Sequence, residues 1–363
     1  MTSPGESPVD SFSAADDVLN GVMQEEPEEI IETRSRREVF FDRLLVSRDL
    51  AILVVAIVLF AIFTIGNPKF ASLNNLSDIT WRLPDLGLIA VGMTFLFIAR
   101  ELDLSVGSHL AFATTFMAFL VVKRHMDPWE ATGLVLLIGV GIGLVNGFAV
   151  TKIGVPSFIF TLGGLAALRG LASVVSGGIT MMVDDTTTPF YRILDGPVLN
   201  SPIPVQFLIM VIVMVIAGFI LAKTKFGSDI YATGGDLESA RNNGVRTDRT
   251  KLICFAVTGG LCALSGVFLF GRLGMAPGDT GSGFELQVIA GIIIGGVGLF
   301  GGRGTMFGSF IGLVILVMLT SGLILIGVKE FWDGIVSGLV ILVAAGLDLF
   351  VRRRAAQATI HAG

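Results

Sequence analysis

The chain has 363 residues, of which 53% are hydrophobic and 15% are charged, whereas a soluble domain usually carries about 25% charged residues. Its apolar residues come in long blocks, which excludes an ordinary soluble domain and indicates a membrane protein. The net charge of -5 favours no class of partner, because the charged residues are concentrated in a few segments. Cys254 and Cys262 share one apolar run and lie about 12 Å apart along a helix, which is too far for a disulfide.

Residues 1–45 are expected to form an acidic, disordered tail on the cytoplasmic side. Ten acidic residues lie from Glu6 to Glu38 without an apolar run, so the segment is poorly suited to build a core. The segment also lacks the basic start and the adjacent apolar stretch of a secretory signal. A dispensable extension is favoured over a regulatory role.

Residues 46–352 are predicted to form the membrane domain, followed by a short cytoplasmic tail at 353–363. A membrane-spanning helix needs about 20 residues. Apolar runs near this length occur at about 49–66, 85–99, 105–122, 131–150, 157–176, 205–223, 251–272, 284–300, 304–326 and 331–351. The run 85–99 is short, so it either borrows residues from a flank or continues through the next polar stretch as a broken helix. The sequence therefore predicts an all-α membrane protein with about ten transmembrane helices.

The distribution of Lys and Arg predicts the orientation, because these residues are enriched in cytoplasmic loops. With ten spans and a cytoplasmic N-terminus, 17 of the 25 Lys and Arg residues fall on the inside and 7 on the outside. Both termini are therefore expected in the cytoplasm. The remaining cation, Arg169, falls inside a span.

The segment from Arg100 to Ser108 is polar and lies between two apolar runs. An ionisable group at membrane depth costs roughly 2.5–3.5 kcal/mol, so its two carboxylates indicate a polar path through the bundle. A short surface loop between two helices is the alternative. We expect Glu101, Asp103 and Ser105 to exchange hydrogen bonds with a polar solute. Asp103 and Ser105 have a structural alternative, which is to cap the helix beginning near Val106, and capping is favoured for Ser105.

Two further polar residues fall inside predicted spans. Arg169 is expected to pair within the bundle with Glu101 or Asp103, because an unpaired cation there is costly. Asn146 is a further candidate for the path, and an ordinary interhelical hydrogen bond is its alternative.

Glycines repeat every four residues at 139, 143 and 147 and again at 304, 308 and 312. This spacing lets helix backbones approach closely, and we favour packing within the chain over a subunit interface. The G-x-G-x-x-G from Gly296 to Gly301 lacks the strand and the acidic residue of a dinucleotide site. The chain also has no phosphate-binding loop motif, so we expect it not to bind ATP itself.

The predicted cytoplasmic loop 224–250 contains a short helix signal. Asp236 is placed to cap it, Glu238 lies in its first turn and Gly244 is placed to end it. The alternative is an ordinary solvated connector. A docking element for a soluble partner is the sharper hypothesis, because nothing in the chain supplies energy.

Four ordered blocks resemble the sugar permeases of bacterial ABC importers, the ribose/xylose/galactose group. Glu101-Leu102-Asp103-Leu104-Ser105-Val106-Gly107-Ser108 resembles the family signature, and Val155 to Gly163 with Arg169-Gly170 resembles a second block. The third is Gly227 to Gly244, and the fourth holds the glycines from Gly295 to Gly308. Within the third, Glu238-Ser239-Ala240 and then Gly244 resemble the E-A-A-x-x-x-G element that docks permeases onto their ATPases, with Ser239 in place of Ala.

The resemblance implies the fold of the vitamin B12 permease type and a bacterial inner-membrane location. It implies three protein partners: a second permease copy, a cytoplasmic ABC ATPase and an extracytoplasmic sugar-binding protein. The coupling residues would be Asp236, Glu238, Ser239, Ala240, Arg241 and Gly244. The loop 177–204, with Asp184, Asp185 and Asp195, is the candidate surface for the binding protein, with a plain connector as its alternative. No cofactor, metal or nucleic acid is expected, ATP is expected on the ATPase, and lipid surrounds the helices.

The substrate implied by the resemblance is a monosaccharide. Glu101 and the pair Phe331-Trp332 favour a pentose such as xylose, while ribose, galactose and inositol stay open. An ion-gradient-driven transporter is the main alternative function, and its carboxylates would be ion sites. A membrane enzyme is disfavoured, because His109, His125 and His361 have no ligand-like spacing with acids.

Overall fold

The computed structural model describes residues 48–199 and 201–328, with a few isolated positions between 334 and 346. The acidic tail and the C-terminal tail lie outside the described residues, as does most of the last predicted span at 331–351.

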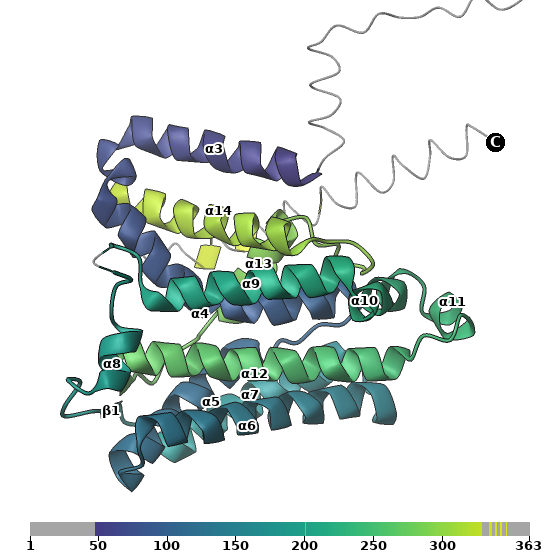
Figure 1. Cartoon of the computed structure of the whole chain (residues 1–363), viewed down its shortest axis with the longest axis horizontal. Helices are drawn as coiled ribbons and strands as arrows, with labels where there is room; N and C mark the ends of the chain where they lie inside the picture. The colour runs from purple at the N-terminus through teal and green to yellow at the C-terminus, as the bar shows by residue number, and fades with distance from the viewer. Residues whose placement is uncertain are drawn as a thin grey trace, which may run out of the picture. The chain divides into compact units, whose positions relative to one another are not determined.

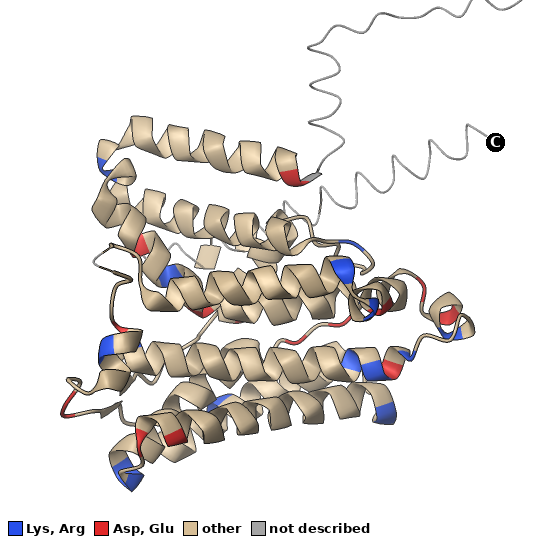
Figure 2. Cartoon of the chain, viewed as in Figure 1, with Lys and Arg blue, Asp and Glu red and all other residues tan. Residues whose placement is uncertain are grey.

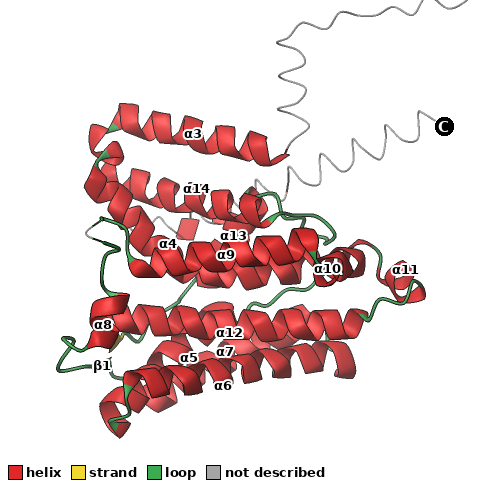
Figure 3. Cartoon of the chain, viewed as in Figure 1, coloured by secondary structure: helices red, strands yellow, loops and turns green. Residues whose placement is uncertain are grey.

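Within the described residues, eight helices are long and apolar enough to cross a membrane. They are α3 (Arg48–Gly66), α4 (Leu73–Ile98), α5 (Val106–Ala118) with the π-helical turn η2 (Phe119–Lys123), α6 (Pro128–Phe148) with η3 (Ala149–Ile153), α7 (Ser157–Ser176), α9 (Val205–Lys223), α12 (Thr247–Leu273) and α14 (Met306–Leu325). The shorter helices are η1 (Pro68–Ala71), α8 (Pro189–Leu194), α10 (Lys225–Gly235), α11 (Leu237–Asn242) and α13 (Phe284–Ile294). Strands β1 (Met181–Met182) and β2 (Met275–Ala276) pair antiparallel. The all-α prediction is confirmed (Figure 3).

Two helix boundaries differ from the apolar runs for local reasons. The short run 85–99 extends into its N-terminal flank, where the Ser72 hydroxyl accepts a hydrogen bond from the Asn75 backbone N–H and caps α4. At its other end α4 stops at Ile98 and Arg100 takes a positive φ of 63°, so the chain leaves the helix instead of continuing through the polar stretch. The run 284–300 gives only the short α13, because Gly295 and Gly296 end it, with Gly296 at a φ of 86°.

The long helices run side by side, and α12 lies in the middle of the bundle (Figure 1). It packs on α4, α5 and α6, while α14 joins α4 to α3 at the other edge. The charged residues gather toward the two ends of the helices (Figure 2). Asp85 in the middle of α4 is an exception, and its carboxylate lies 2.5 Å from the guanidinium of Arg272 in the last turn of α12.

The regularly spaced glycines pack helices within the chain, as expected. A Cβ on Gly259 of α12 would lie 2.3 Å from the Gly139 carbonyl oxygen of α6. In the same way, a Cβ on Gly308 of α14 would lie 2.1 Å from the Gly295 carbonyl oxygen after α13. Each contact leaves no room for a side chain, so the backbones are in direct van der Waals contact.

Candidate functional site

The polar stretch between α4 and α5 is held at its start by an ion pair. The Lys251 ammonium of α12 lies 2.6 Å from the Glu101 carboxylate, and the two side chains are 14% and 10% exposed. The predicted pairing of Arg169 with Glu101 or Asp103 is therefore wrong for Glu101. Lys251 lies 150 positions along the chain, so sequence spacing gave no sign of this partner.

Asp103 lies at the centre of a buried cluster of polar side chains. Its Oδ1 accepts hydrogen bonds from the Ser105 backbone N–H at 2.8 Å and from the Ser105 hydroxyl at 2.5 Å. Its Oδ2 accepts from the Asn146 amide of α6 at 3.1 Å, and that amide also lies 3.2 Å from the Ser105 hydroxyl. We call these three residues the Asp103 cluster. All three are less than 5% exposed, so the cluster is a polar site inside the bundle.

The capping alternative is wrong for the side chain of Ser105. Ser105 does occupy the N-cap position of α5, but its side chain makes no capping hydrogen bond. Its hydroxyl is directed to Asp103 instead. The loop backbone is anchored by α7, because the Thr161 hydroxyl accepts from the Leu104 backbone N–H at 3.0 Å. Thr161 was not predicted, although a hydroxyl in the second turn of an apolar helix is a signal for such a contact.

Arg169 belongs to a separate polar group. Its guanidinium donates to the Thr280 carbonyl at 2.6 Å, in the turn between β2 and α13. Glu285, in the first turn of α13, interacts electrostatically with Arg169 and has a buried Oε2 that makes no hydrogen bond among the described residues. The polar, glycine-rich run from Gly278 to Glu285 was the overlooked signal, since it interrupts apolar sequence as the Glu101 stretch does.

A groove of about 820 Å³ lies between α6 and α7, with an almost wholly apolar lining. Asn146 of the Asp103 cluster is the polar side chain in this lining. Gly164 also lines the groove, and a Cβ there would lie 3.3 Å from Ser105. The Asp103 cluster therefore borders a groove on the side of the bundle.

The loop 224–250 folds into two helices, of which the sequence predicted the second. The Asp236 carboxylate accepts from the Ser239 backbone N–H at 2.7 Å and caps α11, and Glu238 lies in its first turn. Gly244 ends it at a φ of 80°, with the Gly244 and Val245 N–H groups donating back to Arg241 and Ala240. These predicted caps are confirmed. Ala240 is buried, while Glu238, Ser239 and Arg241 are exposed, and α11 extends past the ends of the neighbouring long helices (Figure 1).

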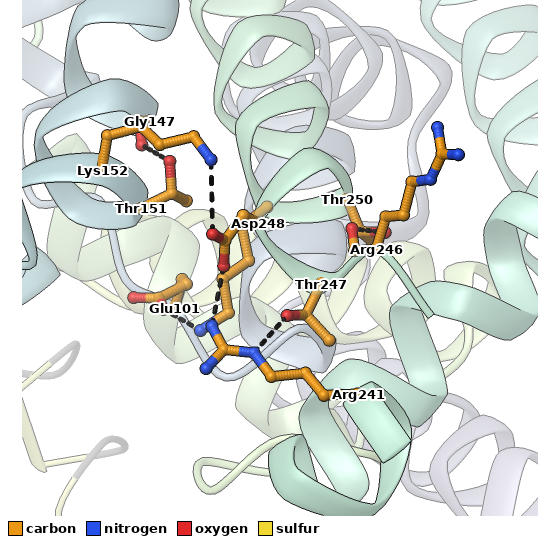
Figure 4. A network of polar contacts seen from close by, with 10 residues as sticks. Glu101, Gly147, Thr151, Lys152, Arg241, Arg246, Thr247, Asp248 and Thr250 are labelled. Carbon is orange, nitrogen blue, oxygen red and sulfur yellow. Dashed lines mark hydrogen bonds and ion pairs between the residues drawn. The ribbon is translucent and has the colours of Figure 1, made fainter. Parts of the chain in front are cut away.

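Basic residues converge on one carboxylate beside α11. The Arg241 guanidinium lies 2.8 Å and the Lys152 ammonium 3.5 Å from Asp248, and Arg241 also donates to the Thr247 hydroxyl (Figure 4). These contacts fasten α11 to the first turn of α12 and to η3. The Glu101–Lys251 pair lies in the same region (Figure 4).

The loop 177–204 is more than a connector. It contributes β1 and α8, and the Phe190 and Tyr191 rings of α8 are buried against Trp129 and Phe270. Asp184, Asp185 and Asp195 are exposed. The Thr187 hydroxyl and backbone N–H hold the pKa of Asp185 below its usual range, so this carboxylate is charged at neutral pH.

Comparison with known proteins identifies the family of this chain. The model of the branched-chain amino acid transport system / permease component family matches residues 75–345. The ribose import permease protein RbsC of Haemophilus influenzae is 37% identical over 300 residues, covering 82% of this chain and 92% of the relative. The autoinducer 2 import system permease protein LsrC of Photorhabdus luminescens is 33% identical, covering 83% and 90%.

The probable ABC transporter permease protein YphD of Escherichia coli is also 33% identical, covering 85% of this chain and 92% of the relative. No solved structure matches the chain. The family match and the apolar helices agree with the resemblance noted in the sequence. The chain therefore belongs to the multi-pass membrane permeases of ABC importers, in the group that includes the ribose and autoinducer 2 permeases.

Proposed function

We propose that this chain is the membrane subunit of an ATP-driven importer of a monosaccharide, with a pentose such as xylose or ribose favoured. The observation that carries the proposal is the buried Asp103 cluster bordering the groove between α6 and α7. A carboxylate inside a membrane bundle is costly, so it usually marks the path of a solute, a proton or an ion. Asp103 and Ser105 offer both acceptors and a donor to sugar hydroxyl groups.

A second copy of the chain completes the path in this proposal. Only 17% of α7 is buried, against 89% of α4. A Cβ on Gly163 or Gly170 of α7 would meet nothing within 4 Å, so these glycines have no close helix partner in the chain. Small residues on an open helix face suit close approach by another helix. With α7 of each copy facing the other, the grooves beside Asn146 would border one central channel.

The ATPase docks on α11. Glu238, Ser239 and Arg241 are exposed on this helix, and Arg241 is held in place by Thr247 and Asp248. The helix is six residues long and is joined to α10 through Asp236 alone. A displacement of α11 would therefore be transmitted directly to α10 and the bundle. The ATPase side is cytoplasmic, as the bias of Lys and Arg predicts, and both termini are then cytoplasmic in the bacterial inner membrane.

The substrate reaches the opposite end of the bundle through a binding protein. Asp184 and Asp185 lie there on the loop before α8, and the anchored ring pair of Phe190 and Tyr191 gives this surface a fixed shape. The ionised Asp185 would attract a basic patch on the partner.

Uptake in cells tests the proposed function. Radiolabelled xylose, ribose, galactose and inositol are offered to cells that carry the permease with its ATPase and binding protein. We expect uptake of one pentose, and its loss in Glu238→Arg at unchanged permease expression. Purification with the ATPase shows the cause of the loss. Glu238→Arg should lose the ATPase, whereas Glu130→Arg, the same charge change at the opposite end of the bundle, is the matched control and should keep it. Uptake that persists without the ATPase would favour a gradient-driven transporter instead.

A further inference from the structure

The last turn of α10 touches the last turn of α4 without any side chain between them. A Cβ added to Gly234 would lie 1.7 Å from the Ile98 carbonyl oxygen and 2.8 Å from the Gly302 nitrogen. Neither contacting group is the end of a flexible side chain, so neither can move aside cheaply. The neighbouring Gly235 is different, because a Cβ there would meet nothing within 4 Å.

A third segment closes this contact. The Gly302 backbone N–H, in the loop between α13 and α14, donates to the Ile98 carbonyl at 2.8 Å. Gly301 has a φ of 82°, and a Cβ there would lie 2.8 Å from both Arg100 and the Gly234 carbonyl oxygen. The ends of α10 and α4 and this loop therefore meet backbone to backbone. We call the contact of Gly234, Ile98, Gly301 and Gly302 the glycine junction.

Side chains of α10 fix the same three segments. The Tyr231 hydroxyl donates to the Gly304 carbonyl at 2.6 Å, and the Phe226 ring packs edge-on against Phe95 of α4. Ile230, which lies between Phe226 and Tyr231 in the sequence, is fully buried. Phe226, Ile230 and Gly234 are spaced by four residues, so they lie on one face of α10. This face of α10 therefore contacts α4 at both of its ends, through Phe226 and Gly234, and Gly234 also contacts the loop between α13 and α14.

The glycine junction lies between two parts of the proposed transporter. On one side, Asp236 alone separates α10 from α11, the proposed ATPase-docking helix. On the other side, Ile98 is three positions before Glu101, whose backbone N–H donates to the Leu96 carbonyl in the same turn. A close-packed contact without flexible side chains transmits a displacement instead of absorbing it.

We propose that the glycine junction is the element through which movement of α11 repositions the Glu101–Ser105 stretch. Gly234 and Tyr231 are then positioning residues of the transport cycle that contact neither the sugar nor the ATPase. This inference rests on the proposed function, because it requires an ATPase on α11 and a solute at the Asp103 cluster.

The ratio of sugar imported to ATP hydrolysed tests the junction. Permease, ATPase and binding protein are reconstituted in liposomes with radiolabelled xylose and ribose as probes. Gly235→Ala is the matched control and should keep the wild-type ratio. Tyr231→Phe should keep assembly and ATP hydrolysis but lower the ratio by about twofold to tenfold, the range expected for one lost hydrogen bond. Gly234→Ala should lower it further.

Several results would overturn the inference. A wild-type ratio in Tyr231→Phe would do so, as would a wild-type ratio in an assembled Gly234→Ala complex. If Gly234→Ala fails to assemble, Tyr231→Phe decides. An equal loss in Gly235→Ala would also count against the junction, because that position has open space. Failure of the proposed function would give a different result, because ATP hydrolysis would then drive no sugar import even in the wild-type complex.

Discussion

At the residue scale, the Asp103 carboxylate accepts three of the four hydrogen bonds in the Asp103 cluster, and the Ser105 hydroxyl accepts the fourth from Asn146. In Asp103→Asn one carboxyl oxygen becomes an amide donor, which faces the Asn146 amide or the Ser105 N–H. We expect sugar uptake to fall by about tenfold to a hundredfold, since a buried polar group left without its partner costs roughly 1–3 kcal/mol. Initial uptake rates at equal expression measure this. Wild-type uptake in Asp103→Asn would show that the cluster is structural.

Glu101 and Lys251 form a second testable unit at this scale. Removing one partner of a mostly buried pair costs about 3–5 kcal/mol, because the other charge is left unpaired. Glu101→Lys and Lys251→Glu should each reduce thermal stability and transport, and the double exchange should restore much of both. The exchange of Glu101 with Arg169 should restore neither, because Arg169 donates to Thr280. Recovery by the Arg169 exchange alone would contradict the observed pairing.

The residue types of the site could be predicted, whereas their partners could not. Costly charges in apolar sequence identified Glu101, Asp103 and Arg169. The partner of Glu101 is 150 positions away, and the choice between Lys251 and Arg169 depends on which helices pack together. Asn146 was a candidate because a side-chain amide in an apolar span needs a hydrogen-bond partner. In the structure that partner is Asp103.

At the element scale, glycine contacts set the distance between helices. Gly143 and Gly141 of α6 form a matched pair, because a Cβ on Gly143 would lie 2.2 Å from the Phe255 carbonyl oxygen, whereas one on Gly141 would meet nothing within 4 Å. Gly143→Ala should destabilise the fold by about 1–3 kcal/mol through overpacking. Gly141→Ala should be neutral or slightly stabilising. Thermal unfolding of the purified variants in detergent distinguishes them, and equal melting temperatures would contradict the packing.

Most long helices could be predicted, because each needs only one apolar run. α10 was missed because Gly227, Gly234 and Gly235 disfavour a helix by propensity. Packing against α9, α12 and α4 overrides that propensity, and it requires glycine where backbones touch. The extension of the run 85–99 into a flank was one of two predicted alternatives, and α4 confirms it. Hydropathy alone did not locate the start, because the first turns contain Asn75, Asp78 and Arg82.

At the scale of the whole molecule, the proposed path requires two copies that meet along α7. Ala167 lies on the exposed part of α7 and lines the groove beside α6. Ala167→Cys should form a disulfide-linked dimer in membranes treated with an oxidant. Both native cysteines are buried, so they should not form this crosslink themselves. Val215→Cys, exposed on α9, is the control and should stay monomeric on denaturing gels. Crosslinking of Val215→Cys in preference to Ala167→Cys would place the interface elsewhere.

The central claim is that ATP hydrolysis on a partner drives a sugar through this chain. The most direct measurement is uptake of radiolabelled xylose and ribose into proteoliposomes that contain the permease and its ATPase, with the binding protein outside and ATP inside. The account predicts uptake that requires ATP and is lost in Glu238→Arg. Uptake by the permease alone, driven by an imposed proton or sodium gradient, would contradict it.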